Sequence, residues 1–168
     1  MSLGLLLLRL LLAGLLFGHS TQKLFGWFGG AGLAGTAPVF EGWGFVPGRR
    51  MVLLAALAEM AGVVSIATGL LVPGGCAVVV GTMTVAAAAT APNGFWAQKG
   101  GCEVPFCYGA LAAILAFIGP GDWSLDRAFG LTGLSGYVWG LVALVVGVAA
   151  AAVPLTSRSR VLQLRRSS

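Results

Sequence analysis

Charged side chains are scarce in this sequence. Asp, Glu, Lys and Arg make up only 9% of the 168 residues, whereas a soluble globular domain has roughly 25%. Apolar residues make up 58% and the mean hydropathy is +0.94. This composition excludes an ordinary water-soluble protein, and its hydrophobicity also excludes an intrinsically disordered chain.

Histidine is almost absent, since His19 is the only one. One imidazole does not define a metal site, and no regular spacing joins His19 to the carboxylates Glu59 and Glu103. The sequence also has no Gly-rich nucleotide loop, no Ser/His/Asp arrangement and no HExxH motif. We therefore predict no metal site and interpret His19 as a hydrogen-bonding residue near the membrane surface.

Cysteine is rare as well, with Cys76, Cys102 and Cys107 as its three positions. The C-x4-C spacing of Cys102 and Cys107 is neither the C-x-x-C of thioredoxin-like sites nor a zinc pattern. Five residues span about 140° around a helix, so a disulfide requires Cys102 to lie in the preceding loop. Two interpretations stay open, which are a redox pair and two small buried hydrophobic side chains.

Basic residues are concentrated at the end of the chain. The net charge is +5, and four of the ten basic residues occupy the last eleven positions: Arg158, Arg160, Arg165 and Arg166. A cationic segment after an apolar run is typical of a cytoplasmic end near anionic headgroups. No aromatic residues interleave with these arginines, so we exclude nucleic acid as a partner.

Long apolar runs are the dominant feature of the sequence. A helix needs roughly 20 mostly apolar residues to cross a bilayer, and Gly- and Pro-rich breaks separate five such runs. The predicted spanning segments are 3–20, 51–72, 75–91, 104–119 and 131–155. Because helices satisfy their own backbone groups in lipid and no alternating barrel strands are present, we predict an all-α membrane protein with a lipid bilayer around it.

The regions between the apolar runs indicate orientation and organisation. The first run lacks a basic region before it and contains Arg9, so we interpret it as a retained helix rather than a signal peptide. Lys23, Arg49, Arg50, Lys99 and the C-terminal arginines all fall on one side if the N-terminus is outside and the C-terminus is cytoplasmic. The long first loop, 19–50, is rich in Gly, Trp and Phe, and we expect it to lie along the membrane interface.

Two charged residues lie inside predicted spanning segments. Arg9 and Glu59 each cost at least about 2.5 kcal/mol at a helix centre, so we expect them to face the bundle interior and to pair. Lys23, Glu103, His19 and Lys99 could join them in one polar cluster. This cluster is interpreted as a pocket for a small polar or quinone-like ligand or a proton path, or as a buried ion pair that fixes helix register. Alternatively, Arg9 extends to the surface, and Glu59 pairs with Lys23 or contacts solvent.

An ordered series of short motifs resembles the DoxX family over about residues 9–127. The motifs are Arg9, Gln22-Lys23-Leu24-Phe25-Gly26, Gly44-Phe45, Pro47, Ala58-Glu59, Gly69-Leu70, Met83, Gly101, Glu103-Val104-Pro105, Gly119-Pro120-Gly121 and Ser124-Leu125-Asp126. The resemblance implies a small bacterial inner-membrane protein with a four-helix transmembrane bundle. The chain departs from this pattern by its fifth apolar segment, its arginine-rich end and the cysteines beside Glu103.

The resemblance also implies candidate roles. Some relatives are subunits linked to thiosulfate:quinone oxidoreduction, and others are proposed to assist thiol redox homeostasis. Carried over by position, the polar motif residues are Arg9, Lys23, Glu59, Glu103 and Asp126. We therefore expect a DoxX-like bundle over 1–130, an additional transmembrane helix over 131–155 and a basic cytoplasmic tail over 156–168.

Two functional hypotheses follow. In the first, the protein is a redox-associated membrane subunit whose pocket of Arg9, Lys23, Glu59 and Glu103 binds a quinone. Secondary candidates for this pocket are His19, Gln22, Lys99 and Asp126, and Cys102 and Cys107 are candidate redox residues. In the second, the protein is a non-enzymatic scaffold or assembly subunit, whose Gly62, Gly69 and Ala86–Ala89 allow close helix packing. Both hypotheses expect a protein partner in a membrane complex, or a homo-oligomer.

Overall fold

The computed structural model describes residues 2–167. Met1 and Ser168, the outer ends of the ranges expected for the bundle and the tail, lie outside the described residues. Five apolar α-helices form the body of the protein: α1 (Ser2–Phe25), α3 (Gly48–Thr68), α4 (Val72–Thr90), α5 (Glu103–Ile118) and α7 (Tyr137–Ser167). The described residues contain no β-strand, and the prediction of an all-α membrane fold is confirmed.

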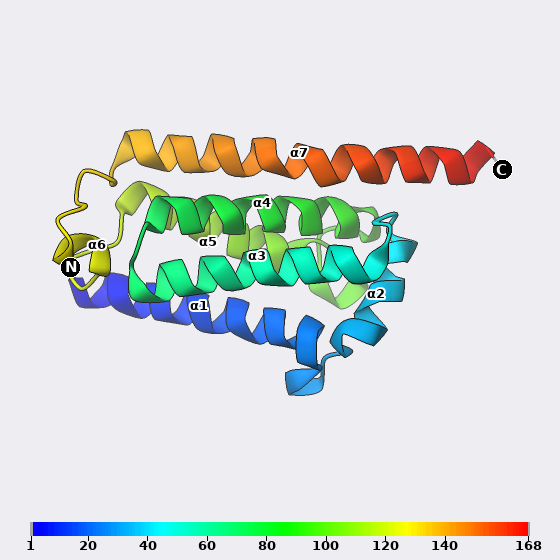
Figure 1. Ribbon diagram of the computed structural model, residues 1–168, viewed down its shortest axis with the longest axis horizontal. Helices are drawn as coiled ribbons and strands as arrows, with labels where there is room; N and C mark the ends of the chain where they lie inside the picture. Colours follow the sequence, from blue (N-terminus) through cyan, green and yellow to red (C-terminus); the bar gives the residue numbers. More distant parts are fainter. Residues whose placement is uncertain (1, 168) are drawn as a thin grey trace.

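The five helices lie alongside one another and alternate in direction (Figure 1). Helices α1, α4 and α7 run one way, and α3 and α5 run back. We call the end where α1 begins and α3 turns into α4 the Arg9 end, and the opposite end, where α2 (Gly32–Gly42) lies, the α2 end. Because five helices, an odd number, run between these two ends, the chain begins at the Arg9 end and finishes at the α2 end.

Four of these helices, α1, α3, α4 and α7, are long and apolar enough to cross a membrane. Helix α5 is apolar but has only 16 residues, about 24 Å at 1.5 Å per residue, which is shorter than a hydrocarbon core of about 30 Å. It packs against α4 and α7 and returns the chain to the Arg9 end. The fourth predicted segment, 104–119, is therefore a shorter helix that completes the bundle.

The first connection is more regular than the sequence suggested. Helix α1 continues to Phe25, and a 3-10 turn, η1 (Trp27–Gly29), precedes α2, so much of the range 19–50 is helical. The side chains of Trp27 and Phe28 are exposed, as expected for aromatic residues at a membrane interface. Two further 3-10 turns, η2 (Ala91–Asn93) and η3 (Ala97–Lys99), join α4 to α5.

The C-terminal segment also differs from expectation. Helix α7 runs without interruption to Ser167, so the boundary expected after residue 155 falls inside a single helix. Pro154 is tolerated within it, as in many membrane helices. Beyond Pro154, Arg158 donates a hydrogen bond to the Trp43 carbonyl at 2.8 Å and lies over the ring of Phe45, which braces this part of α7 against the α2–α3 connection.

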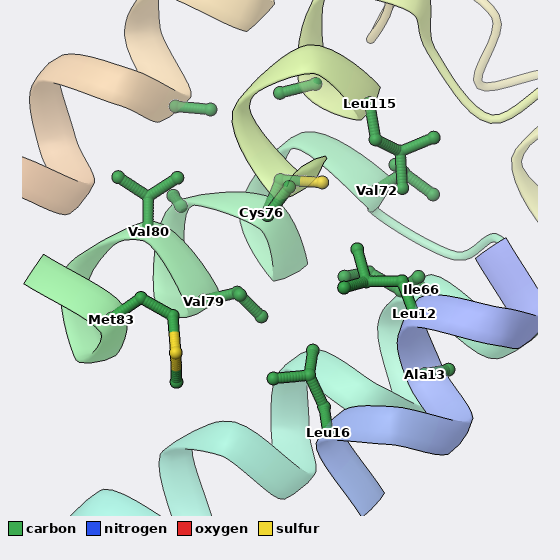
Figure 2. Close-up of a cluster of buried hydrophobic side chains, with 14 of the residues drawn as sticks. Leu12, Ala13, Leu16, Ile66, Val72, Cys76, Val79, Val80, Met83 and Leu115 are labelled. Atoms are coloured by element: carbon green, nitrogen blue, oxygen red, sulfur yellow. The ribbon is translucent and has the colours of Figure 1, made fainter. Parts of the chain in front are cut away.

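The core is centred on α4, which contacts α3, α5 and α7. Its buried side chains face those of α1, α3 and α5 (Figure 2). The labelled members of this cluster are Leu12, Ala13, Leu16, Ile66, Val72, Cys76, Val79, Val80, Met83 and Leu115. Because α4 carries no charged residue, it can occupy the middle of the bundle without burying a charge.

Glycines allow α4 and α7 to approach closely. A Cβ atom on Gly147 would lie 2.6 Å from the Ala77 carbonyl oxygen, and one on Gly81 would lie 2.9 Å from the Gly147 carbonyl oxygen. Both obstacles are backbone atoms of the facing helix. Small residues at such crossings are the usual way in which membrane helices pack without a hydrophobic driving force.

Adding one methyl group at this crossing should destabilise the protein. For Gly147→Ala we expect the free energy of unfolding to fall by about 1–3 kcal/mol, because backbone atoms cannot move aside as a side chain does. Gly4→Ala is the matched control, since it lies on a helix with no atom within 4 Å of its added Cβ. Thermal unfolding in detergent followed by circular dichroism measures both. Equal melting temperatures for the two variants would contradict the tight α4–α7 contact.

Candidate functional site

Arg9 is fully buried at the Arg9 end of the bundle. Its guanidinium group donates four hydrogen bonds, all to backbone carbonyl oxygens. Nε and Nη2 bond to Ile66 and Ala67 in the last turn of α3, at 2.8 and 2.9 Å. Nη1 bonds to Pro120 and Trp123 in the connection after α5, at 2.7 and 2.8 Å. A cation at a helix C-terminus also interacts favourably with the helix dipole.

Gly69 makes room for this arrangement. It ends α3 with a φ of +70°, and a Cβ there would lie 2.5 Å from Nη2 of Arg9. Glycine is required on both counts, because other residues avoid this backbone conformation and because the guanidinium occupies the space.

Asp126 holds the same turn from the other side. Its side chain is buried, and its two oxygens accept hydrogen bonds from the backbone N–H groups of Leu71 and Val72, at 2.7 and 3.1 Å. Its own backbone N–H donates to the Gly69 carbonyl at 2.9 Å. The carboxylate thereby caps the start of α4, where N–H groups lack helical partners. Arg9 and Asp126 together bind the α3–α4 turn to α1 and to the α5–α7 connection.

A second polar group lies deeper in the bundle. Glu59, near the middle of α3, is 1% exposed. Its Oε1 forms an ion pair with the Lys23 ammonium at 2.5 Å, and its Oε2 accepts a hydrogen bond from the buried Ser20 hydroxyl at 3.0 Å. Ser20 and Lys23 are three residues apart on α1 and so project from the same face of that helix. Each oxygen of the buried carboxylate therefore has a partner.

The predicted pairing of Arg9 with Glu59 is wrong. Arg9 and Ser20 are eleven positions apart on α1, about 16 Å along its axis, and Arg9 bonds to the end of α3 while Glu59 bonds to Lys23. Arg9 does not extend to the surface either, since its side chain is fully buried. The alternative partner for Glu59, Lys23, is the one found.

Glu103 lies apart from both groups. It begins α5, and its Oε2 accepts a hydrogen bond from the Ala97 backbone N–H at 2.8 Å. Lys99 is exposed at the end of η3 in the same connection. The expected grouping of Arg9, Lys23, Glu59 and Glu103 is thus divided into three places, of which one holds both Lys23 and Glu59.

The remaining candidates make weaker contacts. His19 packs edge-on against Tyr108 of α5, with 6.3 Å between ring centroids. Gln22 donates to the Phe28 carbonyl at 3.4 Å. Cys102 and Cys107 are both free thiols, Cys102 partly buried before α5 and Cys107 exposed on it. No group of three metal-ligating side chains occurs in the described residues.

Two cavities are present whose lining residues include none of the charged candidate residues described above. One, of about 280 Å³, is almost wholly apolar and lies between α4 and α7, beside Pro73 and Trp139. The other, of about 380 Å³, lies between α2 and α3 at the α2 end, beside Glu41 and Arg49. Neither is lined by Arg9, Glu59 or Glu103, so these two cavities are not the predicted quinone pocket.

The sequence interpretation missed two contributions to these sites. Ser20 was not singled out, although its spacing from Lys23 could have placed it beside the same carboxylate. The carbonyl partners of Arg9 leave no trace in residue type, because every residue has a carbonyl. Their position follows only from the fold.

This chain is a multi-pass α-helical membrane protein, since its long helices have apolar surfaces and its buried charged side chains are hydrogen-bonded within the chain. Within that class, a family model described as DoxX matches residues 4–92, more than half of the chain, and the protein belongs to the DoxX family. The matched segment contains Arg9, Lys23 and Glu59, whereas Glu103 and Asp126 lie outside it. Neither a curated protein nor a solved structure matches the sequence.

Proposed function

We propose that this DoxX-family protein is a non-enzymatic membrane subunit that associates with another membrane protein or with a second copy of itself. The observation that carries this proposal is that the buried charged side chains are hydrogen-bonded within the chain itself. Arg9, Glu59 and Asp126 each bond to other parts of the chain, and no buried side-chain nitrogen or oxygen in the described part lacks a partner. Groups bonded in this way stabilise a bundle rather than present donors to a ligand.

A surface feature of α1 supports association. Gly14 and Gly18 form a G-x3-G pair on an apolar helix, and a Cβ added at either position would meet no atom within 4 Å. Such pairs allow two membrane helices to approach closely. The small residues named from the sequence differ in this respect, because Gly62 packs against Val79 and Gly69 against Arg9 within the chain.

Association is tested by size in a mild detergent. We expect the wild-type protein to be purified as a complex, and Gly14→Leu combined with Gly18→Leu to lower its share at least about tenfold, because bulky side chains separate the helices. Gly4→Leu is the matched control on the same helix, again with open space around it. Light scattering with chromatography measures the complex. A monomeric wild-type protein, or an unchanged double variant, would contradict the proposal.

A redox-associated subunit is the second candidate, and the Lys23–Glu59 pair favours it. The Lys23 side chain is 13% exposed, so the pair lies in the bundle with one member reaching its edge, beside His19 and Tyr108. Intramembrane ionisable residues commonly mark ligand or proton pathways. Under this hypothesis, bound quinone is extracted with the wild-type protein and lost from Glu59→Gln. Equal extracts from both would reject it.

The proposed location is the bacterial inner membrane, with the Arg9 end outside and the α2 end in the cytoplasm. Arg49, Arg50 and the four arginines of α7 then lie on the cytoplasmic side, as the positive-inside rule requires. Residues 1–130 act in this proposal as the DoxX-like unit, and α7 as an added helix whose basic end replaces the separate tail expected over 156–168.

A further inference from the structure

The cavity between α2 and α3 has an unusual combination of walls. One face of α2 supplies an apolar side, with Leu33, Ala34, Ala37 and Pro38, and ends in Glu41. Arg49, in the first turn of α3, supplies a cation. The volume of about 380 Å³ lies within the range of about 300–1,000 Å³ for small-molecule sites.

The two charges in this cavity do not satisfy each other. Glu41 and Arg49 form no ion pair within 4 Å, and the Arg49 side chain makes no hydrogen bond in the described part of the chain. Glu41 uses Oε1 to accept the Gly48 backbone N–H at 3.0 Å. Its Oε2 has no partner among residues 2–167. Glu41 and Arg49 thus line one hollow, both residues are exposed, and neither the Oε2 atom nor the guanidinium is bonded to another group of residues 2–167.

The position of the cavity indicates what surrounds it. Arg49 is the second residue of a membrane-spanning helix, so it lies at the limit of the apolar zone. The neighbouring segment exposes the aromatic side chains of Phe25, Trp27 and Phe28, which favour the headgroup level of a bilayer. The apolar wall on α2 and the two charges therefore lie where phospholipid headgroups meet their acyl chains.

We propose that this cavity binds one phosphatidylethanolamine molecule by its zwitterionic headgroup. The phosphate accepts hydrogen bonds from the Arg49 guanidinium, a pairing whose planar geometry suits two oxygens at once. The primary ammonium donates to Oε2 of Glu41, and the glycerol end of the acyl chains lies against Leu33, Ala34 and Pro38. Both exposed charges are then paired by one ligand.

Other common lipids match these walls less well. Phosphatidylcholine has the same charges, but its quaternary ammonium has no N–H group to donate to Glu41. Phosphatidylglycerol has no cation, so its phosphate would leave the Glu41 carboxylate unpaired close to a second negative charge. The cavity therefore distinguishes an ammonium donor from a cation in general.

Competition between lipids tests this assignment. The full-length protein is reconstituted in nanodiscs with equal amounts of the three lipids and analysed by native mass spectrometry after release. We expect one retained phosphatidylethanolamine, preferred over phosphatidylcholine by about tenfold or more, as one charge-assisted hydrogen bond allows. Equal retention of these two lipids by the wild-type protein would overturn the proposal.

Variants separate the two ends of the headgroup. Glu41→Gln keeps an acceptor for the Gly48 N–H but removes the charge, and should abolish the preference between the two zwitterionic lipids. Arg49→Gln should lower retention of all three lipids at least about tenfold. Arg160→Gln, an equal change of charge on an exposed part of α7 outside the cavity, should retain the wild-type preference. A preference that survives Glu41→Gln would overturn the proposal.

Two further measurements identify the acyl end and the source of the ligand. Ala34→Phe fills the cavity without changing its charge and should reduce retention, while circular dichroism confirms that the variant is folded. Soluble phosphoethanolamine, added at the concentration of the lipid, should not displace it, because it lacks the apolar contacts with α2. Displacement at that concentration would show a site for a free zwitterion and overturn the assignment to a lipid.

Discussion

Replacing Arg9 by Gln is expected to lower the free energy of unfolding by about 3–5 kcal/mol. The guanidinium is fully buried and donates to four carbonyl oxygens from two distant segments. A glutamine amide has two N–H groups and a shorter reach, so at least two of these carbonyls lose their partner. Each buried polar group left without a hydrogen bond costs about 1–3 kcal/mol, and the α3–α4 turn also loses its attachment to α1.

The control for this variant is Arg127→Gln. Arg127 forms an ion pair with Asp122 at 3.5 Å, and both side chains are 60% exposed, so its loss should change stability by no more than about 1 kcal/mol. Unfolding in mixed micelles with increasing sodium dodecyl sulfate, followed by circular dichroism, measures both variants. If Arg9→Gln unfolds together with Arg127→Gln, the hydrogen bonds of Arg9 do not hold the bundle together.

Replacing Lys23 by Met is the second change with a large expected effect. Glu59 is 1% exposed, and removing its cation leaves a buried carboxylate with only the Ser20 hydroxyl as a partner. Breaking a buried ion pair from one side typically costs about 3–5 kcal/mol. We expect a loss of this size in the same unfolding measurement.

A double variant separates the value of the pair from the penalty of breaking it. Lys23→Met combined with Glu59→Leu removes both charges and fills their space with apolar atoms, and we expect it to recover most of the lost stability. Ser20→Ala is measured alongside these variants, because the Ser20 hydroxyl has no carboxylate to bind once Glu59 is replaced. A double variant as unstable as Lys23→Met alone would mean that the ion pair itself stabilises the bundle.

Hydropathy predicted the helices well, but less so their ends. All five apolar runs of the sequence correspond to α1, α3, α4, α5 and α7, because lipid requires each spanning segment to satisfy its own backbone. Helix α7 begins at Tyr137, six residues later than expected, and continues through polar residues to Ser167. In this extension Arg158 and Arg165 donate hydrogen bonds to the carbonyls of Trp43 and Glu41, contacts that composition does not reveal.

The candidate site was predictable where it depended on paired side chains. The buried carboxylate of Glu59 needed a cationic partner, and the sequence contains two candidates, Arg9 and Lys23. The position of α1 relative to α3 along the bundle determines which of them lies beside Glu59. Arg9 instead satisfies carbonyls at a helix end, a partner available at every position of the chain. The cavity at Glu41 and Arg49 depends on the short helix α2 packing against the start of α3, in a segment that had been expected to be a loop.

The long sequence separation between Arg9 and its hydrogen-bond acceptors also has a consequence for biosynthesis. Its bond to Pro120 joins residues that are 111 positions apart, and a ribosome adds about 5–20 residues per second. Roughly 6–22 seconds therefore pass, at that rate, between synthesis of this arginine and synthesis of its final acceptors. Arg9 therefore cannot complete its four hydrogen bonds until residues 120–123 have been synthesised, so this end of the bundle closes only after α5 has been made.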